Sequence, residues 1–235
     1  MPISAEGALL LLALVLYVFD SALLLQSNEW ALEGLRGGQW RARFGLQSWK
    51  LGGREPLLPN LLMPWRPLLR VGWRFDEGLS AVASLPEPKT ASAALKLTAA
   101  LLLLLIFIAL PLALFVYPLL TLKISVVAAI YASCLFNGLL LWRERAQLGL
   151  SKADCAKLGI ECIACPPFAI NIVRKLSLRF PMLDAAQALR LLPDQAAFVR
   201  EQMLVRLREQ IDFEAEGSPR MARLLNVAAT LEPTT

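Results

Sequence analysis

Two apolar runs, Leu97–Tyr117 and Ile124–Trp142, lie almost back to back and constrain this chain more than any other feature. Neither run contains a charged residue. Because a helix rises about 1.5 Å per residue, each run is long enough to cross a bilayer core of about 30 Å. The pattern predicts a transmembrane hairpin, and the segments on its two sides must therefore lie on the same face of the membrane.

A third apolar run extends from Gly7 to Leu25. A signal peptide would have a basic start and a small-residue cleavage site. Residues 1–6 contain neither Lys nor Arg, however, and the segment after the run, Gln26 to Glu29, is polar. We interpret the run as an uncleaved transmembrane helix. The predicted fold class is a mainly α membrane protein with three transmembrane helices, a small cytosolic β unit and a helical C-terminal tail.

The distribution of basic residues predicts how the chain is oriented. Lys and Arg are dense in residues 27–93 and again in residues 143–157, whereas the hairpin tip has only Lys123. Basic residues are retained on the cytoplasmic side of a membrane. We therefore expect a multi-pass inner-membrane protein with its N-terminus outside and its C-terminus in the cytoplasm. Along the chain this gives a first transmembrane helix (1–26), a cytosolic loop (27–93), the hairpin (94–145) and a cytosolic helical tail (146–235).

The loop is expected to contain the β unit. Residues 28–35 are predicted to continue the first helix until Gly37 and Gly38 stop it. From Gln39 onward, large and polar residues alternate on the approach to Gly52-Gly53, a dipeptide typical of a tight hairpin turn. Residues 68–75 are predicted to form a further strand.

Several helical segments are predicted in the tail, among them a short helix over residues 183–192 and another towards the C-terminus. Ser151 and Asp154 have the spacing of a helix cap, and Pro166-Pro167 would end the helix that follows. Residues 171–180 are basic and amphipathic, which favours an interfacial helix. Residues 194–213 are predicted to form a soluble helix with one apolar face, consisting of Ala196, Val199, Met203, Leu207 and Ile211.

The loop also holds most of the tryptophans, interleaved with basic residues. Five of the six Trp lie there, namely Trp30, Trp40, Trp49, Trp65 and Trp73. Indole rings beside cations suit the headgroup layer of a membrane or packing on the tail, although the same composition could stack on single-stranded nucleic acid. No nucleic-acid-binding motif accompanies them. We therefore expect a lipid bilayer with anionic headgroups as a partner, and no nucleic acid.

Three cysteines, Cys155, Cys162 and Cys165, fall with Leu158 on one face of the predicted helix that starts at residue 152. Such a face could bind zinc, hold part of an iron–sulfur site or exchange disulfides through Cys162 and Cys165. The set is incomplete, because the chain has no His and only four Cys. Buried packing is the reading that we favour, and we expect no metal and no cofactor.

Asp20 and Asn137 are the polar residues that we expect near the inner ends of the first and third spans. Each lies five residues before the end of its run, so both should lie at the same depth, with Lys96 as the nearest cation. Ionisable groups inside membranes face partners in the bundle. A polar clamp between the two helices is the preferred reading; a proton or ion site, or an Asp20 that only reaches the headgroups, are the alternatives.

The absence of His removes Ser-His-Asp and Cys-His catalysis and HExxH zinc sites. We expect a non-catalytic interaction or scaffold protein that presents a cytosolic face to protein partners or to a second copy. The alternatives are a membrane enzyme, which would use the cysteine face or act on lipid headgroups, and a small transporter subunit that uses Asp20.

Overall fold

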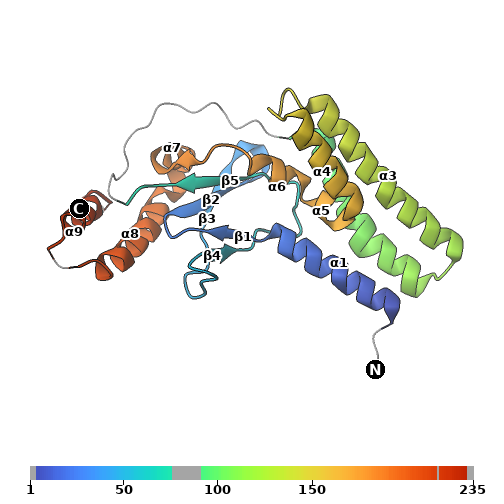
Figure 1. The fold of residues 1–235 in the computed structure, drawn as a ribbon, viewed down its shortest axis with the longest axis horizontal. Helices are drawn as coiled ribbons and strands as arrows, with labels where there is room; N and C mark the ends of the chain where they lie inside the picture. Colours follow the sequence, from blue (N-terminus) through green and yellow to red (C-terminus); the bar gives the residue numbers. More distant parts are fainter. Residues whose placement is uncertain (1–3, 76–90, 216, 232–235) are drawn as a thin grey trace. The chain divides into compact units, whose positions relative to one another are not determined.

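The computed structural model describes residues 4–75, 91–215 and 217–231 (Figure 1). The protein is mostly helical, at 62%, with small sheets. Its residues group into two compact units, each built from three separate stretches of chain. Unit 1 comprises Met1–Ala22, Leu58–Pro67 and Pro88–Arg179, and unit 2 comprises Leu23–Leu57, Leu68–Glu87 and Phe180–Thr235. Each unit thus draws on segments that are far apart in sequence.

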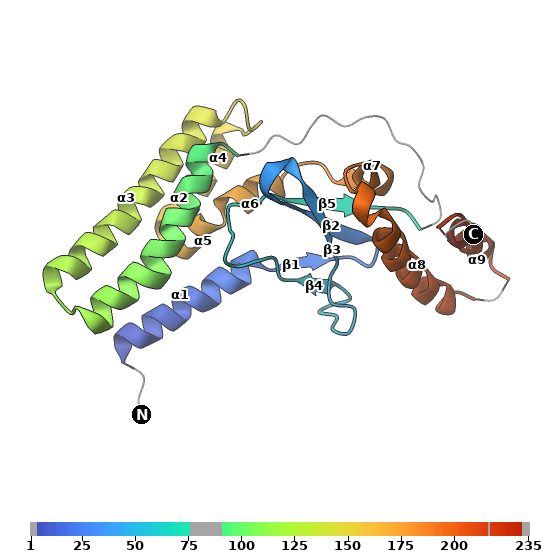
Figure 2. The same ribbon diagram turned by 180° about the vertical axis from the view of Figure 1, so that it is seen from behind.

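Unit 1 is helical. Its elements are α1 (Ala5–Ser21), α2 (Ala93–Leu104), the π-helical turns η2 (Leu105–Ala109) and η3 (Leu112–Val116), α3 (Leu120–Glu144), α4 (Lys152–Ala164), α5 (Pro166–Ile170) and α6 (Ile172–Ser177). The helix from α2 to η3 and helix α3 lie side by side as a hairpin (Figure 2). Pro111 lies between the two π-helical turns, where its missing N–H interrupts the regular hydrogen-bond ladder.

Two helices of unit 1 are long and apolar enough to cross a membrane. They are Ala93–Val116 and Leu120–Glu144, and only 22% and 33% of their most apolar windows are buried. The two lengths match the predicted hairpin. Helix α1 is shorter, at 17 residues, although leucines are exposed along it as well. The predicted first span was too long at its C-terminal end, because Leu23–Leu25 forms a strand instead of a last helical turn.

Unit 2 contains two small sheets. Strands β1 (Leu23–Leu25) and β4 (Glu55–Leu57) form an antiparallel pair. The larger sheet has the order β3-β2-β5-β6. It consists of β2 (Glu29–Gly34), β3 (Trp40–Arg43), β5 (Leu68–Gly72) and β6 (Leu183–Asp184). Because β6 comes from the tail and pairs in parallel with β5, the β unit is not confined to the loop where it was expected.

The prediction that residues 28–35 continue the first helix was wrong. Residues Glu29–Gly34 form the central strand β2, with β3 on one side and β5 on the other. Trp30 and Leu32 face the helical core of unit 2, while Glu29 and Glu33 alternate with them on the opposite face of the strand. All six residues of the strand are buried, and its pairing with β3 and β5 overrides the local resemblance to a helix end, because the two ladders pair backbone groups on both sides of the strand.

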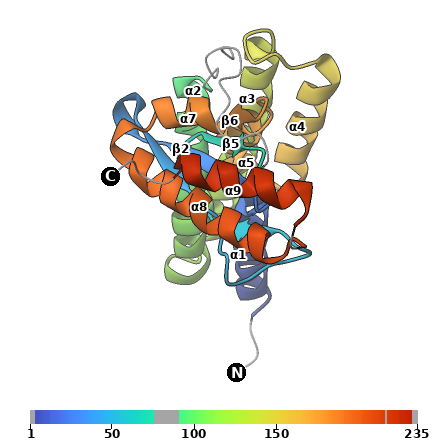
Figure 3. The same cartoon turned by 90° about the vertical axis from the view of Figure 1, so that its left-hand side faces the viewer.

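The helices of unit 2 cover one face of its larger sheet. They are α7 (Ala185–Arg190), a short turn η4 (Pro193–Gln195), α8 (Ala196–Asp212) and α9 (Pro219–Leu231). Helices α8 and α9 lie side by side (Figure 3). The predicted apolar face of the long tail helix is confirmed, since Val199, Met203 and Leu207 are fully buried against the sheet.

Two local predictions hold in detail. The helix at residue 152 is α4, and its capping box joins Ser151 and Asp154 in both directions. The Gly52-Gly53 turn is also confirmed, with both glycines at positive φ (58° and 78°) and backbone bonds in both directions between Leu51 and Arg54. Positive φ at both central residues defines the type I′ hairpin turn, which glycine adopts without strain.

Candidate functional site

Asp20 lies in the last turn of α1 and belongs to a polar cluster of unit 1. We define this cluster as Asp20, Ser21, Glu161, Asn171, Arg174 and Lys175. The ammonium of Lys175 lies 3.0 Å from Asp20 Oδ1 and 3.5 Å from Glu161 Oε2, so one cation bridges carboxylates from α1 and α4. The side chain of Asn171 donates to Asp20 Oδ2 at 3.1 Å. The cluster therefore joins α1 to α4 and α6 through charge-assisted hydrogen bonds.

The buried half of the polar cluster is built around Asn171 and Arg174. The Asn171 amide also donates to Ser21 Oγ at 2.8 Å, and its oxygen accepts from Arg174 Nη1 at 3.2 Å. The Arg174 guanidinium donates further to the backbone carbonyls of Asn60 and Met63. A buried guanidinium is stable only where its donors are paired, so these bonds fix the Leu58–Pro67 stretch against α6.

The expected pairing of Asp20 with Asn137 was wrong. The side-chain oxygen of Asn137 on α3 accepts a hydrogen bond from Thr98 on α2, and both residues are buried between the two helices of the hairpin. Lys96 is half-buried in the first turn of α2, and Lys175 takes the place that we had assigned to it beside Asp20. Equal depth along two helices does not make them neighbours, and α1 instead packs against α5.

The residues that sequence reasoning missed are Asn171, Arg174 and Lys175. They were assigned to an interfacial helix whose cations would face headgroups, but α6 is buried almost all round, with Ile172, Val173 and Leu176 in the core. The available signal was that these apolar residues cover more than one face of a helix, which indicates burial on all sides. Pro166 and Pro167 end α4, and the chain turns there into the centre of unit 1.

The cysteine face of α4 is a packing face. Cys155 and Cys162 are buried together with Leu158, Cys165 is half-buried, and all are free thiols. The Cys155 thiol lies 3.5 Å from the Leu141 carbonyl, which ties α4 to the end of α3. Burial raises the pKa of Cys162 to about 12 and also raises the pKa of Cys155 and of Cys165. These thiols are protonated near neutral pH, and a protonated thiol is a poor nucleophile and a poor metal ligand.

Within residues 4–75, 91–215 and 217–231, no group of three or more His, Cys, Asp or Glu side chains could hold a metal ion.

Unit 2 has a buried ion pair that the sequence did not indicate. Arg206 of α8 is 1% exposed and Glu55 of β4 is fully buried, and their charged atoms are 2.7 Å apart. The guanidinium also lies 4.7 Å from the centre of the Phe44 ring and donates to the Gly45 carbonyl. Gly45 has no room for a side chain, because a Cβ there would lie 2.5 Å from the Glu55 Cβ. The pair links α8 to β4 and to the stretch before it.

The tryptophans fall into different environments. Trp30 and Trp73 are core residues of unit 2, Trp40 and Trp65 are half-buried, and Trp49 is exposed. The sequence allowed contact with headgroups or packing on the tail, and packing on the tail describes the two buried rings, since Trp30 and Trp73 share a core with α7, α8 and α9.

Comparisons with protein families, with curated proteins and with solved structures found no match for this chain.

Proposed function

We propose that this chain is a non-catalytic integral inner-membrane protein that uses unit 2 to engage other proteins on the cytosolic face. The observation that carries the proposal is the exposure of the apolar hairpin. Leucines and other large apolar side chains are exposed from the start of α2 to the end of α3, and most of both windows is uncovered by the protein. Water disfavours such a surface by about 25 cal/mol per Å², whereas lipid accepts it.

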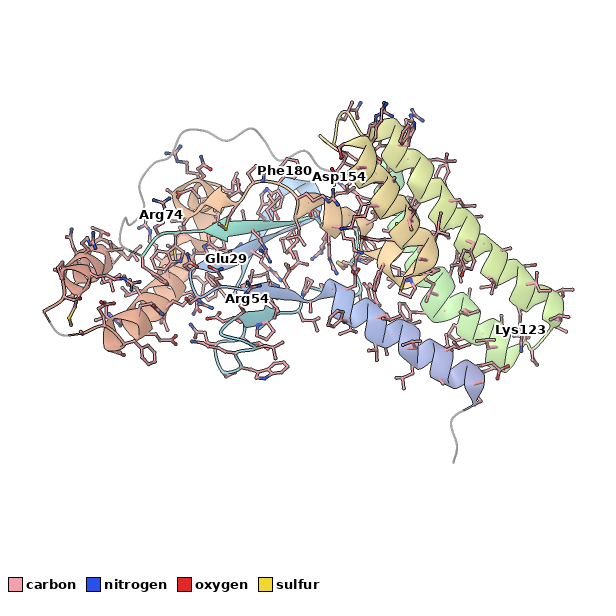
Figure 4. The ribbon with its side chains drawn as sticks, viewed as in Figure 1. Glu29, Arg54, Arg74, Lys123, Asp154 and Phe180 are labelled. Carbon is pink, nitrogen blue, oxygen red and sulfur yellow. The ribbon has the colours of Figure 1, made fainter. Side chains whose placement is uncertain are left out.

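Two further contacts support the proposed orientation. Lys123 at the hairpin tip pairs with Glu6 in the first turn of α1 at 3.4 Å, so both lie at the same end of unit 1 (Figure 4). Strands from the two flanks of the hairpin meet in one sheet of unit 2. Both contacts support an arrangement with the N-terminus and the hairpin tip outside and unit 2 in the cytoplasm.

The proposed role in protein interaction is supported by helix α8. Phe198 and Val205 are exposed on α8, and Phe213 is exposed directly after its last residue. Their spacings of seven and eight residues place them along one side of the outer face of the helix. Apolar side chains aligned on one solvent-facing stripe are typical of helices that pack against a partner. The charged groups of the polar cluster, by contrast, are engaged in holding unit 1 together.

The proposal makes two separable claims, and each has its own experiment. Extraction of membranes with alkaline carbonate tests the anchor: the chain should stay in the pellet, and its release would refute membrane integration.

Affinity purification in mild detergent tests the interaction role, comparing the unaltered chain with the variant Phe198→Ser/Phe213→Ser. The variant should lose stoichiometric protein partners that a Leu225→Ser control on α9 retains. Equal recovery of partners by both variants would refute the assigned surface.

A further inference from the structure

The loop from Leu46 to Arg54, which we call the tip loop, projects from unit 2. Its end is the type I′ turn at Gly52 and Gly53, and a Cβ placed on either glycine would meet no atom within 4 Å. Arg54 ends the loop directly before β4, and Figure 4 shows it beside that strand. The backbone bonds between Leu51 and Arg54 hold the turn in a fixed shape. A rigid projection with open surroundings is suited to contact something outside the unit.

The tip loop exposes three large apolar side chains. Leu46 is 56% exposed, Trp49 is 59% exposed and Leu51 is 54% exposed. Their proximity on a short turn sets them apart from the single exposed leucines found on any surface. Trp49 differs from Trp30 and Trp73 of the same unit, which are buried in the core. An indole ring that the fold leaves outside, beside two leucines, matches the side chains that enter the boundary between lipid headgroups and acyl chains.

The positive charge of the tip loop favours a negatively charged partner. Lys50 and Arg54 are exposed, and there is no Asp or Glu from Leu46 to Arg54. The next acidic residue, Glu55, is fully buried and neutralised by Arg206. Lys50 has a partner in Glu209 at 3.6 Å, but both side chains are more than a third exposed, and such surface pairs are weak and readily exchanged. The loop therefore offers two cations next to an apolar wedge, which complements an anionic lipid surface.

The connection of the loop to the proposed anchor favours the same partner. Strand β1 begins at Leu23, directly after α1, and is paired with β4, whose first residue follows Arg54. The strand that follows α1 in the chain is thus paired with the strand that follows the tip loop. A weak lipid contact is strengthened when it is tethered to an anchor in the same bilayer, because the tether supplies a high effective concentration.

We infer that the tip loop is a second membrane-contact site, in which Trp49, Leu46 and Leu51 enter an anionic lipid surface and Lys50 and Arg54 bind its phosphates. The inference rests on the proposed membrane anchor and adds to it. It assigns lipid contact to unit 2 and names the side chains that make it.

The experiment places a photoreactive p-benzoylphenylalanine at position 49 of the full chain, reconstituted in nanodiscs that contain phosphatidylglycerol. After illumination, mass spectrometry separates lipid adducts from protein adducts. The matched control carries the same residue at position 225, because Leu225 is 50% exposed on α9 of the same unit. Position 49 should give several times more lipid adduct than position 225. Lys50→Gln and Arg54→Gln should each lower the yield about fivefold, and phosphatidylcholine discs should lower it as well.

Three results would overturn the inference: equal lipid adduct at positions 49 and 225, adducts of position 49 with protein alone, or a yield that the two charge variants leave unchanged. A failure of the anchor is distinguishable from these results. If the chain does not insert into nanodiscs, the same photoreactive protein is mixed with preformed phosphatidylglycerol vesicles. Lipid adduct at position 49 then supports the tip loop as a surface contact without a transmembrane anchor, and its absence refutes both.

Discussion

Val71 and Leu183 are partners in one parallel ladder, although the whole apolar hairpin lies between them in sequence. Sheet hydrogen bonds of this kind cannot form across a bilayer, because its core admits no unpaired backbone. If the hairpin crosses a membrane, the strand before it and the strand after it must therefore lie on the same side. The distribution of basic residues predicts that both flanks of the hairpin lie on the same side, and the β5–β6 pairing requires it for any membrane-crossing hairpin.

The first prediction concerns this topology. Reporters of cytoplasmic location inserted between Gly52 and Gly53 and fused after Thr235 should both be active, whereas a reporter at the hairpin tip beside Lys123 should be active only as an extracytoplasmic fusion. The measurement is paired alkaline phosphatase and green fluorescent protein activity. Opposite locations for the two reporters of unit 2 would rule out the β5–β6 pairing in the membrane-inserted chain.

The second prediction concerns the salt bridge between Asp20 and Lys175. The variant Asp20→Ala should lower the stability of unit 1 by about 2 kcal/mol, because the buried Asn171 amide and the half-buried Lys175 ammonium each lose one acceptor and keep only Ser21 and Glu161. Thermal unfolding in detergent measures the loss. Lys175→Met and the double variant complete a cycle, which should show a favourable coupling.

The exposed ion pair of Arg179 and Asp154 provides the control for that cycle. Its charged atoms are 2.8 Å apart, closer than those of Lys175 and Asp20, but both side chains are more than a third exposed. The variant Arg179→Gln should leave the melting temperature unchanged, because solvent screens the pair. An equal loss in both cases would mean that the polar cluster gives unit 1 no special stability.

The third prediction concerns Arg206 and Glu55 in unit 2. The variant Arg206→Met should cost about 3–5 kcal/mol, since it leaves a buried carboxylate without its counter-charge. The double variant Arg206→Met/Glu55→Met should recover most of that loss, because one oxygen of Glu55 has no hydrogen-bond partner in the described structure and the pair carries a desolvation cost. Denaturant unfolding followed by tryptophan fluorescence measures both. A double variant no more stable than the single one would contradict this account.

The fourth prediction concerns Cys162 and pH. Because burial raises its pKa from 9.0 to about 12, the folded protein keeps a proton that the unfolded chain releases above pH 9. The stability from this thiol is complete below pH 9 and is lost as the pH rises from 9 to about 12. The variant Cys162→Ala should show a shallower decline of unfolding free energy over that interval. Identical slopes would mean that the thiol is accessible to solvent, and fast alkylation of the native protein at pH 8 would show the same.

Local patterns in the sequence determined several features by themselves. The uncharged lengths of the two runs fixed the helices from α2 to η3 and α3, and the Ser151–Asp154 spacing fixed the start of α4. The Gly52-Gly53 pair fixed the turn of the tip loop, and helical periodicity fixed the buried face of α8. Each of these depends on residues a few positions apart, whose mutual geometry is set by the backbone alone.

The tertiary structure decided which segments meet. Asp20 is 155 positions before its cation Lys175, and Glu55 is 151 positions before Arg206. No sequence periodicity links residues so far apart. The equal depth of Asp20 and Asn137 in their apolar runs therefore predicted Asn137 and Lys96 as the partners of Asp20. For the same reason, the basic residues near the runs were predicted to lie at the membrane surface. Trp30, Arg174 and Arg206 are buried for the same reason: the partner that covers or neutralises each of them is supplied by a distant segment. The residues next to a charged side chain in sequence do not show whether it will be buried beside a counter-charge or exposed to solvent.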